Sequence, residues 1–470
     1  MKEEKEVAQV TYSKLGDHRG HKRIWLEGKK LADIGFVRYA SYRTLVNYQT
    51  KMIVLTLDEK GDRKVAGRKR GEKEIPILDF SNDTVTKLFK GATRVKATFS
   101  KSIGHQPSTI LIEVHHEDVK LNDREDRLKK NAKTGSVTEG SACSGAAVFA
   151  AAMKQGMHEG GVESSVEWII DREGNYLQVA LDNNPAITGD TVIFEASLEE
   201  LEPELLSPVD VFQFSLPCTG QGVAGKSKNK ISRAEDHPTD ATSVFGVMAS
   251  IKASNPSIIS SENVPEAQSS ATYALIKAEL QRIGYVIYEY ILDSVQAGSF
   301  ESRKRYWFLA VSKGIDNIAQ ASNFSIKDYD KTYHTLGQLL EPISDDDKMW
   351  ADNQYLKDKA ITDKAAGKGF ANRQLLTEDS QRCGTIGRHY NKRRSTEPFV
   401  TRHQDDKERL LTPIEHCRAK DVPECFVKGV SATTAHQILG QSGLWNSARG
   451  MGNLIAEIIS QVVNGEEVVC

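Results

Sequence analysis

The sequence predicts an α/β protein whose main domain is a doubly wound, mostly parallel sheet, with a small second domain and a β-rich module before it. Three observations support this fold class. From Val137 onward, short apolar runs alternate with segments of helical pattern. Several of these runs end in an acidic residue or in a turn of small residues. Residues 1–117 instead contain short β-type runs that are separated by turns.

Residues 1–117 are predicted to form the β-rich module, whose role the sequence leaves open. Strands are expected at five short runs, 23–28, 52–58, 75–80, 95–99 and 109–114. The runs around Gly35-Phe36 suggest a swapped hairpin or a small barrel, for DNA contact or dimerisation. The basic stretch from Arg63 to Lys73 is compatible with a solvated loop, and also with nucleic-acid or partner contact.

Residues 118–135 are highly charged and are predicted to be a linker. The core domain follows at 136–315 and begins with a turn of small residues at 142–147. A helix is expected from Val148 to Met153 and another up to about Asn183. Strands are expected at 166–171, 192–195 and 209–216.

The carboxyl ends of these strands are where a ligand of such a sheet would bind. The turn at 142–147, Asp171, Glu195 and Cys218 all follow strand ends. We therefore expect them to gather at one site.

Residues 316–408 are polar and rich in loops, and they are predicted to form the small second domain. Cations mix there with aromatic residues, a pattern that suits phosphate and base contacts and equally suits a charged surface loop. The segment 409–470 is expected to return to the core. It begins with a helix capped by Thr412 and Glu415, and it ends with an amphipathic helix at 451–463.

Composition limits the classes of function. The 470 residues carry a formal net charge of −2, so nucleic-acid binding would have to come from local patches. The first residues lack the apolar core of a signal peptide, and no run of about 18 apolar residues predicts a membrane span. Six scattered cysteines without a CxxC pair indicate a reducing, cytoplasmic setting and no metal site. His416-Cys417 and Cys425 would supply only two or three ligands.

Four motifs follow one another through the core: Pro217-Cys218, Glu262-Asn263-Val264, Arg303-Lys304-Arg305 and 437–442. In this order, with a variable basic region before the last motif, residues 136–470 resemble the cytosine-C5 DNA methyltransferases. The resemblance implies the methyltransferase fold, S-adenosylmethionine as cofactor and sequence-specific action on double-stranded DNA. It also implies a bacterial or phage modification enzyme, with or without a cognate restriction endonuclease.

The resemblance assigns the chemistry to four side chains. Cys218 would add to carbon 6 of cytosine, so that carbon 5 can take the methyl group before elimination releases the cysteine. Glu262 would donate a hydrogen bond to N3 of the base. Arg303 would bind the carbonyl oxygen of the base and orient Glu262, whereas Arg305 would contact backbone or the neighbouring carboxylate. A packed strand-end cysteine and a helix N-terminal acid are the alternatives for Cys218 and Glu262.

The resemblance also assigns cofactor contacts. Gly145 would allow close backbone approach to the methionine portion, Asp171 would bind the ribose and Glu195 the adenine amino group. Each acid alone is also compatible with a solvated strand end. The remaining expected cofactor residues are Ser144, Pro217, Gln441 and Ser442.

The sequence departs from the family pattern in several places. Thr219 follows the cysteine where the family has Gln, and the Gln comes at 221. Cys143 and Ala147 replace an aromatic residue and a glycine in the first loop, which leaves adenine stacking by this loop in doubt. The arginine motif opens with Glu301 instead of Gln, and Gln441 replaces Asn.

DNA contacts are expected from two regions. Enzymes that act on a base rotate it out of the duplex, and the glycine- and lysine-rich loop after Cys218 suits a moving lid or a plain flexible loop. The expected contacts are Gln221, Lys226, Arg388, Lys392, Arg393 and Arg394. Two other functions remain open: an RNA or tRNA cytosine-5 methyltransferase on the same scaffold, and a non-catalytic DNA-binding regulatory protein.

Overall fold

The chain forms two compact units, Met1–Asp123 and Arg124–Cys470, in a computed structural model. The structure describes residues 6–104, 106–218, 221, 232–233, 236, 241–367, 373–402 and 404–467. None of the helices in these ranges is long and apolar enough to cross a membrane.

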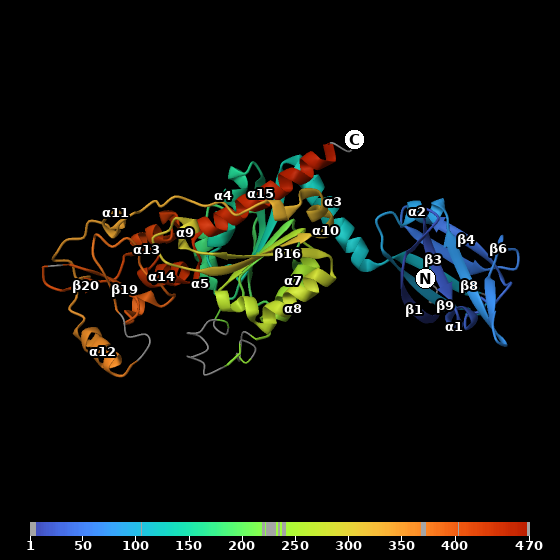
Figure 1. Ribbon diagram of the computed structural model, residues 1–470, viewed down its shortest axis with the longest axis horizontal. Coiled ribbons are helices and arrows are strands. Elements are labelled where there is room, and N and C mark those ends of the chain that lie inside the picture. The colour runs from blue at the N-terminus through green and yellow to red at the C-terminus, as the bar shows by residue number, and fades with distance from the viewer. Residues whose placement is uncertain are drawn as a thin grey trace. The chain divides into compact units, whose positions relative to one another are not determined.

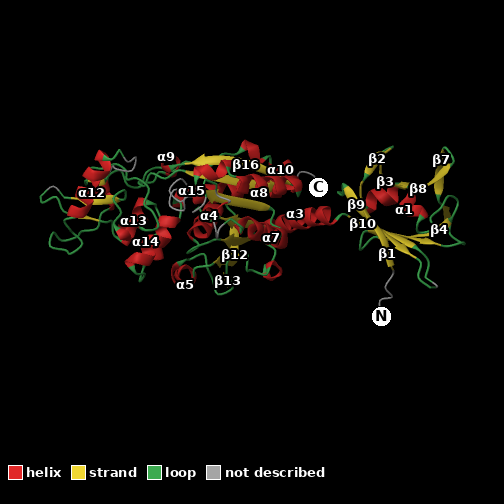
Figure 2. Cartoon of the chain, turned by 90° about the horizontal axis from the view of Figure 1, so that it is seen from below, coloured by secondary structure: helices red, strands yellow, loops and turns green. Residues whose placement is uncertain are grey.

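The first unit contains two antiparallel sheets, which confirms the predicted β-rich module (Figure 2). One sheet has the order β1 (Glu6–Lys14), β9 (Arg94–Lys101), β10 (Thr109–Val114), β5 (Met52–Leu57), β4 (Ser41–Asn47) and β6 (Arg63–Lys64). The other has the order β2 (Gly16–His18), β3 (His21–Glu27), β8 (Lys73–Ser81) and β7 (Ala66–Arg70). The helices α1 (Lys29–Ala32) and α2 (Asp83–Leu88) complete the unit.

The core of this unit is apolar, and the first sheet is open between its edge strands β1 and β6. Among the described residues the suggested small barrel is therefore absent. Gly35 takes a positive φ of 88°, which places Phe36 in the core with no exposed surface.

The segment that we expected to be a charged linker is part of a helix, α3 (His116–Thr134). Its charged side chains find partners because the helix presents one face to a protein interior. In the second unit, the Arg124 side chain donates to Ser312 Oγ at 2.9 Å, and Glu125 accepts from the Gly314 amide at 2.8 Å. Leu128, one turn later, is fully buried. The high charge of this segment therefore does not make all of its side chains solvent-exposed.

The second unit is built on a seven-stranded sheet. Its order is β13 (Val192–Glu195), β12 (Glu163–Asp171), β11 (Ser136–Ala142), β14 (Val211–Phe214), β15 (Ile258–Asn263), β17 (Arg305–Ser312) and β16 (Tyr285–Leu292). The first five strands are parallel, which confirms the predicted mostly parallel sheet. Strand β17 runs antiparallel to both β15 and β16, so that its beginning meets the end of β15.

Helices cover both faces of this sheet (Figure 1). One face packs against a core that takes residues from α4 (Val148–Glu159), α5 (Gly174–Asn183), α10 (Lys313–Ala319) and α15 (Trp445–Glu467). The opposite face packs against α7 (Ser243–Ser254) and α8 (Ala271–Arg282). The helix α15 lies along α4 although some 300 residues separate them, so the end of the chain returns to the first strand–helix unit.

Residues 316–408 hold more regular structure than their polar sequence predicted. They contain α11 (Leu336–Leu339), α12 (Gln354–Ala365), β18 (Gln374–Leu376), β19 (Pro398–Thr401) and β20 (Glu408–Arg409). A small apolar core that includes Leu336, Leu356 and Phe399 supports them. The next helix, α13 (Pro413–Ala419), begins with the predicted reciprocal cap between Thr412 and Glu415. Two further helical elements lead to α15: η6 (Glu424–Val427) and α14 (Ala432–Gln441).

Candidate active site

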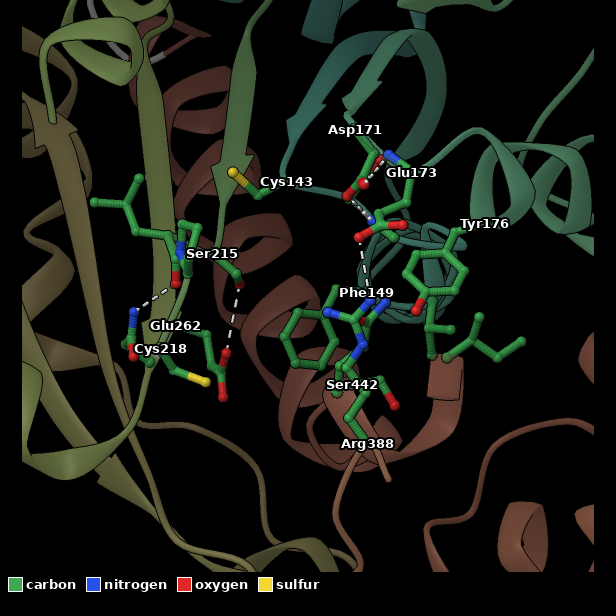
Figure 3. Close-up of a pocket in the computed structure, with 18 of the residues that line it drawn as sticks. Cys143, Phe149, Asp171, Glu173, Tyr176, Ser215, Cys218, Glu262, Arg388 and Ser442 are labelled. Carbon is green, nitrogen blue, oxygen red and sulfur yellow. Dashed lines mark hydrogen bonds and ion pairs between the residues drawn. The ribbon is translucent and has the colours of Figure 1, made fainter. Parts of the chain in front are cut away.

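A cavity of about 570 Å³ opens at the carboxyl edge of the parallel strands, within the size range of small-molecule sites. Its wall includes turns after β11, β12, β14 and β15, the start of β17 and two later segments, 385–394 and 438–442. Cys218 and Glu262 lie on one side, Asp171, Glu173 and Tyr176 on the other (Figure 3). The cavity therefore has two halves, which we call, after the ligands that the sequence predicts for them, the base half with Cys218 and Glu262 and the cofactor half with Asp171, Glu173 and Tyr176.

Cys218 stands in the loop that follows β14. The side chain of Asn263 donates to the carbonyl of Leu216 at 2.9 Å and so fixes this loop against the end of β15. Cys218 itself is exposed, but it is exposed into the concave cavity, with protein on most sides. Burial by the surrounding protein raises the pKa of the thiol, the Glu262 charge adds to the rise, and the Arg305 and Arg303 charges oppose it.

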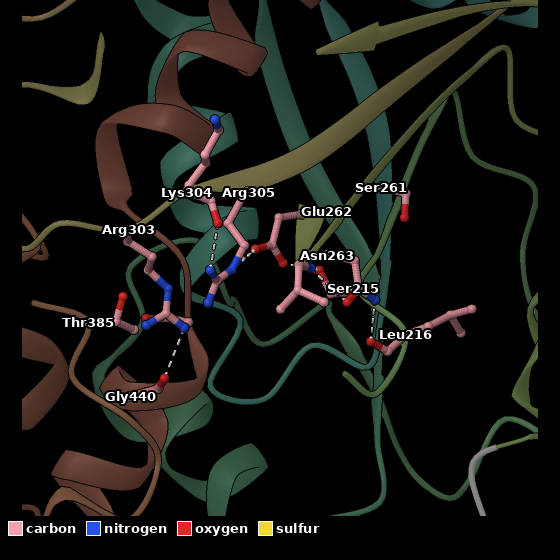
Figure 4. Close-up of polar contacts among 12 residues, drawn as sticks. Ser215, Leu216, Ser261, Glu262, Asn263, Arg303, Lys304, Arg305, Thr385 and Gly440 are labelled. Carbon is pink, nitrogen blue, oxygen red and sulfur yellow. Dashed lines mark hydrogen bonds and ion pairs between the residues drawn. The ribbon is translucent and has the colours of Figure 1, made fainter. Parts of the chain in front are cut away.

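Glu262 pairs with Arg305 at 2.9 Å between Oε1 and Nε (Figure 4). The pair results from strand register: Glu262 lies opposite Trp307 on the antiparallel β17, two residues beyond Arg305. Ser215 Oγ donates to the other carboxylate oxygen at 3.4 Å. Burial raises the pKa of Glu262 despite the neighbouring cations, and burial lowers the pKa of Arg305 to about 10.

Arg303 lines the same half, but it does not orient Glu262 as we expected. Its guanidinium donates to Glu301 at 3.0 Å, to the carbonyl of Ile386 at 3.3 Å and to the carbonyl of Gly440 at 3.0 Å. Strand β17 begins at Arg305, so the register with β15 places Arg305 beside Glu262, whereas Arg303 lies in the non-strand segment before it and meets other partners. Arg305 contacts the Glu262 carboxylate and the carbonyl of Lys304, the two kinds of partner expected for it, and it therefore lies where Arg303 was expected to orient Glu262.

Glu301, which stands where the family has Gln, is completely buried. Its carboxylate lies 3.0 Å from the ammonium group of Lys420 as well as 3.0 Å from Arg303. These cations lower the pKa of Glu301 against the opposing effect of burial. The departure from the family pattern is thus accommodated by a buried lysine, which no motif indicated.

The cofactor half is organised by Asp171 at the end of β12. Its carboxylate accepts from the amides of Gly145 at 2.7 Å and of Glu173 at 2.9 Å, and it so holds the turn after β11. Burial raises the pKa of Asp171. Gly145 has a φ of 56°, and an added Cβ would lie 2.8 Å from the side-chain nitrogen of Gln441. The backbone can therefore approach a ligand closely at this turn.

Six of the seven expected cofactor residues line the cavity: Ser144, Gly145, Asp171, Pro217, Gln441 and Ser442. Glu195 does not, although Ala196, Ser197, Leu198 and Glu199 after it do. The carboxylate of Glu195 lies against Gly174 at the start of α5, where an added Cβ would come within 2.5 Å of it. Polar turn amides next to apolar walls suit a nucleoside bearing an amino acid, and in this respect the residues fit S-adenosylmethionine.

Phe149, Glu173 and Tyr176 are among the cavity residues that no sequence motif indicated. Phe149 lies beside Trp307, with ring centroids 5.3 Å apart. Glu173 and Tyr176 begin the helix after Asp171, and their spacing of three residues was the available indication that they share a face.

Arg388, for which a DNA contact is expected, lies in the wall of the cofactor half, and its expected contact stays a prediction. Its guanidinium pairs with Glu173 at 3.1 Å and stands 5.4 Å from the centre of the Tyr176 ring. The contact joins residues 215 positions apart, so sequence position alone could not indicate it.

The other expected DNA contacts are distributed differently. Arg393 donates to Asn353 at 3.2 Å and to the carbonyl of Met349 at 3.4 Å, so it braces the small domain. Lys392 and Arg394 are exposed, and Arg394 also reaches the cavity wall. Gln221 is buried, and its backbone N–H donates to the carbonyl of Cys218 at 3.0 Å. Lys226 lies outside the described residues.

Comparison with known proteins identifies a family. The model of the C-5 cytosine-specific DNA methylase family matches residues 143–450. The type II methyltransferase M.SsoII of Shigella sonnei is 25% identical over 256 residues, which cover 53% of this chain and 64% of that protein. The type II methyltransferase M1.ScrFI of Lactococcus lactis subsp. cremoris is 24% identical over 260 residues, covering 54% and 63%. The chain thus matches just under two thirds of the length of these relatives.

Two solved structures are similar in fold. The S. pombe Dnmt2 methyltransferase superposes with a TM-score of 0.52 at 16% identity, over 69% of this chain and 98% of that chain. The Entamoeba histolytica methyltransferase EhMeth gives 0.52 at 15% identity, over the same shares of both chains. At these identities the similarity concerns the fold alone.

Proposed function

The chain belongs to the C-5 cytosine-specific DNA methylase family, and from this premise we propose that it methylates carbon 5 of cytosine in double-stranded DNA. One observation carries the proposal. The exposed thiol of Cys218 and the Glu262–Arg305 pair share a single cavity with the Gly145–Asp171 turn. A base and a methyl donor bound in the two halves would meet inside it.

Cytosine carbon 5 is a poor nucleophile, and the proposed role of Cys218 is to make it a better one. The thiol gives its proton to water, and the sulfur forms a bond to carbon 6 while the electrons of the ring double bond move through carbon 4 toward N3. S-adenosylmethionine, when bound, would supply an electrophilic methyl group for carbon 5 and leave as S-adenosylhomocysteine. Water then takes the proton of carbon 5, the electrons of that C–H bond re-form the ring double bond, and the sulfur leaves carbon 6 as the thiolate.

Glu262 is proposed to donate a hydrogen bond to N3 of the base. The raised pKa of its buried carboxyl group favours the protonated form that such a donor requires. Arg305, at 2.9 Å, holds the carboxyl group in place. Both arginines bring positive charge to the half of the cavity where negative charge develops on the base.

Activation of the thiol is proposed to accompany substrate binding. Burial raises the pKa of Cys218, so the free protein holds mainly the unreactive thiol. Recognition of the DNA sequence is proposed for the region 316–408, with the exposed Lys392 and Arg394 as phosphate contacts.

The test is methyl transfer from labelled S-adenosylmethionine to mixed-sequence DNA and, in a second arm, to RNA. We expect label in DNA, and Cys218→Ser should reduce its rate by about three orders of magnitude or more, as removal of a nucleophile does elsewhere. Cys218→Ser should also form no covalent adduct with 5-fluorocytosine DNA.

Cys425→Ser is the matched control, since Cys425 is exposed and lies outside the cavity. It should retain both the transfer and the adduct. Label in RNA but not in DNA would favour the RNA methyltransferase. Label in neither would favour the regulatory, non-catalytic protein.

A further inference from the structure

A buried lysine outside the cavity lining contacts two segments that contribute walls of the cavity. Lys420 follows α13 and has no exposed surface. Its ammonium group lies 3.0 Å from Glu301 Oε2 and donates to the carbonyl of Ser442 at 3.0 Å. Glu301 opens the arginine motif, and Ser442 ends the segment that lines the cofactor half.

The backbone around Lys420 holds the same two segments. The carbonyl of Ala419 accepts from the amide of Glu301 at 2.8 Å, and the carbonyl of Lys420 accepts from the amide of Trp445 at 3.2 Å. The lysine is therefore fixed between the segments, and its side chain has no freedom to choose other partners.

Both contacts of the lysine continue directly to the cavity. On one side, Glu301 holds Arg303, which lines the base half and also binds the carbonyl of Gly440. On the other side, Ser442 is next to Gln441, whose side chain lies against Gly145. One ammonium group thus sets the distance between the arginine motif and the wall of the cofactor half.

Burial of the Lys420 ammonium group is unfavourable, which argues that this side chain does more than fill space in the core. Burial and the Arg303 charge lower the pKa of Lys420 to about 7, while Glu301 opposes the fall. A buried ion pair contributes little net stability compared with well-packed apolar residues. An apolar pair at 301 and 420 would lose the bond to Ser442 and would leave the buried Arg303 without its carboxylate partner.

We propose, building on the proposed function, that Lys420 is a positioning residue that couples the cofactor half of the cavity to the arginines of the base half. It touches neither substrate nor cofactor. Its contribution is to keep the Gly440–Ser442 segment and Arg303 in register, so that a methyl donor and a base are held at the reacting distance.

The test compares Lys420→Met with Arg409→Met. Arg409 is an equally buried cation of the same C-terminal segment, paired with Glu415, but it lies outside the cavity wall. Both variants should lower the melting temperature. At a temperature where both remain folded, Lys420→Met should raise the KM for S-adenosylmethionine about tenfold and lower kcat about 10- to 100-fold, whereas Arg409→Met should leave both within about twofold.

The double variant Glu301→Gln with Lys420→Met tests whether charge balance alone explains the effect. It leaves Arg303 with an amide oxygen in place of its carboxylate partner, so the melting temperature should not recover. The KM should not recover either, because the bond to Ser442 is still lost. The proposal is overturned if the double variant regains wild-type KM and kcat, or if Arg409→Met changes them as much as Lys420→Met does.

Binding of S-adenosylhomocysteine, measured by calorimetry, distinguishes this proposal from the proposed function. Weaker binding by Lys420→Met than by the wild type is expected whether or not the nucleic-acid substrate has been identified. A wild-type protein that binds no S-adenosylhomocysteine and transfers no methyl group would refute the proposed function and this inference with it. Wild-type activity together with unchanged binding in Lys420→Met would refute the inference alone.

Discussion

The two units of the chain fill their interiors in different ways. Among the described residues of the first unit, the buried polar side chains are few, namely Ser100, Ser108, Thr109, His115 and Asp118. The second unit buries carboxylates, guanidinium groups, imidazoles and an ammonium group, including Glu139, Glu301, Arg409, His416 and Lys420. Among the described residues, the first unit buries one carboxylate, Asp118, which Arg94 and two backbone amides compensate, so charge compensation inside the core is mainly a feature of the second unit.

This difference between the two units indicates where function constrains the fold. Buried ion pairs of the second unit join segments that are far apart in the chain, such as Glu301 with Lys420 and Arg127 with Asp210. Such pairs fix geometry at the cost of stability. The first unit is held together mainly by apolar burial. Each part of this comparison can be tested.

The largest effect is expected from Arg409→Met in the second unit. The variant leaves the completely buried Glu415 without its guanidinium partner, and removal of one member of a buried pair costs about 3–5 kcal/mol. Native-state hydrogen exchange of peptides from α13 should report the loss. Arg409→Lys, which keeps the charge but loses the two-point contact, should fall between the variant and the wild type. A loss of unfolding free energy below about 1 kcal/mol would contradict this difference between the units, because the Arg409–Glu415 pair would then contribute no more than a surface ion pair.

A somewhat smaller effect is expected in the first unit from Leu55→Ala. Leu55 is fully buried in β5, and deletion of its side chain should cost about 2–4 kcal/mol through lost burial and a residual cavity. Hydrogen exchange of peptides from β4, β5 and β10 is the measurement. Leu45→Ala on the neighbouring strand is the control, because Leu45 is 67% exposed and should change stability by less than about 0.5 kcal/mol. Equal losses in the two variants would contradict an apolar core in this unit.

The smallest effect, with the opposite sign, is expected from Glu139→Gln. Burial raises the pKa of Glu139 to about 7 from a usual value of 4.5. Below pH 4.5 the carboxyl group is protonated in the folded and the unfolded chain. Between pH 4.5 and 7 it ionises only when the chain unfolds, so wild-type stability falls as the pH rises.

Glu139→Gln should therefore be more stable than the wild type by about 1–3 kcal/mol at pH 8 and should lose this advantage at pH 4. Denaturant unfolding at the two pH values is the measurement. Glu202→Gln, at an exposed position, should show no such dependence on pH. A stability advantage for Glu139→Gln that is larger at pH 4 than at pH 8 would contradict a raised pKa of Glu139 in the folded chain.

The sequence allowed much of the fold to be predicted, because strand and helix patterns are local. The alternation from Val137 onward indicated the parallel sheet, and its strand ends placed Asp171 and Cys218 on one edge. The reciprocal cap at Thr412 was equally local. The charge of the segment 118–135 predicts a linker, and this prediction is wrong because the partners of Arg124 and Glu125 lie almost 190 residues away in the sequence.

The detailed contacts of the candidate site were harder to predict for the same reason. Motif order alone could not tell which arginine would meet Glu262, since strand register decides it. Lys420 belongs to no motif, and its role depends on contacts with Glu301 and Ser442 that exist only in the folded chain. Arg388 was noticed as a cation, but its position against Glu173 and Tyr176 depends on how the small domain packs.

The return of the C-terminal segment to the cavity has a consequence for how the protein is made. A ribosome completes the Cys218 loop, Glu262 and Arg305 more than a hundred residues before it reaches Gly440. Until then Arg303 lacks one of its carbonyl partners and the cofactor half lacks one wall. A nascent chain therefore carries every reactive group without a closed pocket to use them. Competence for catalysis would arise in a single late step, when α14 and α15 leave the ribosome and dock.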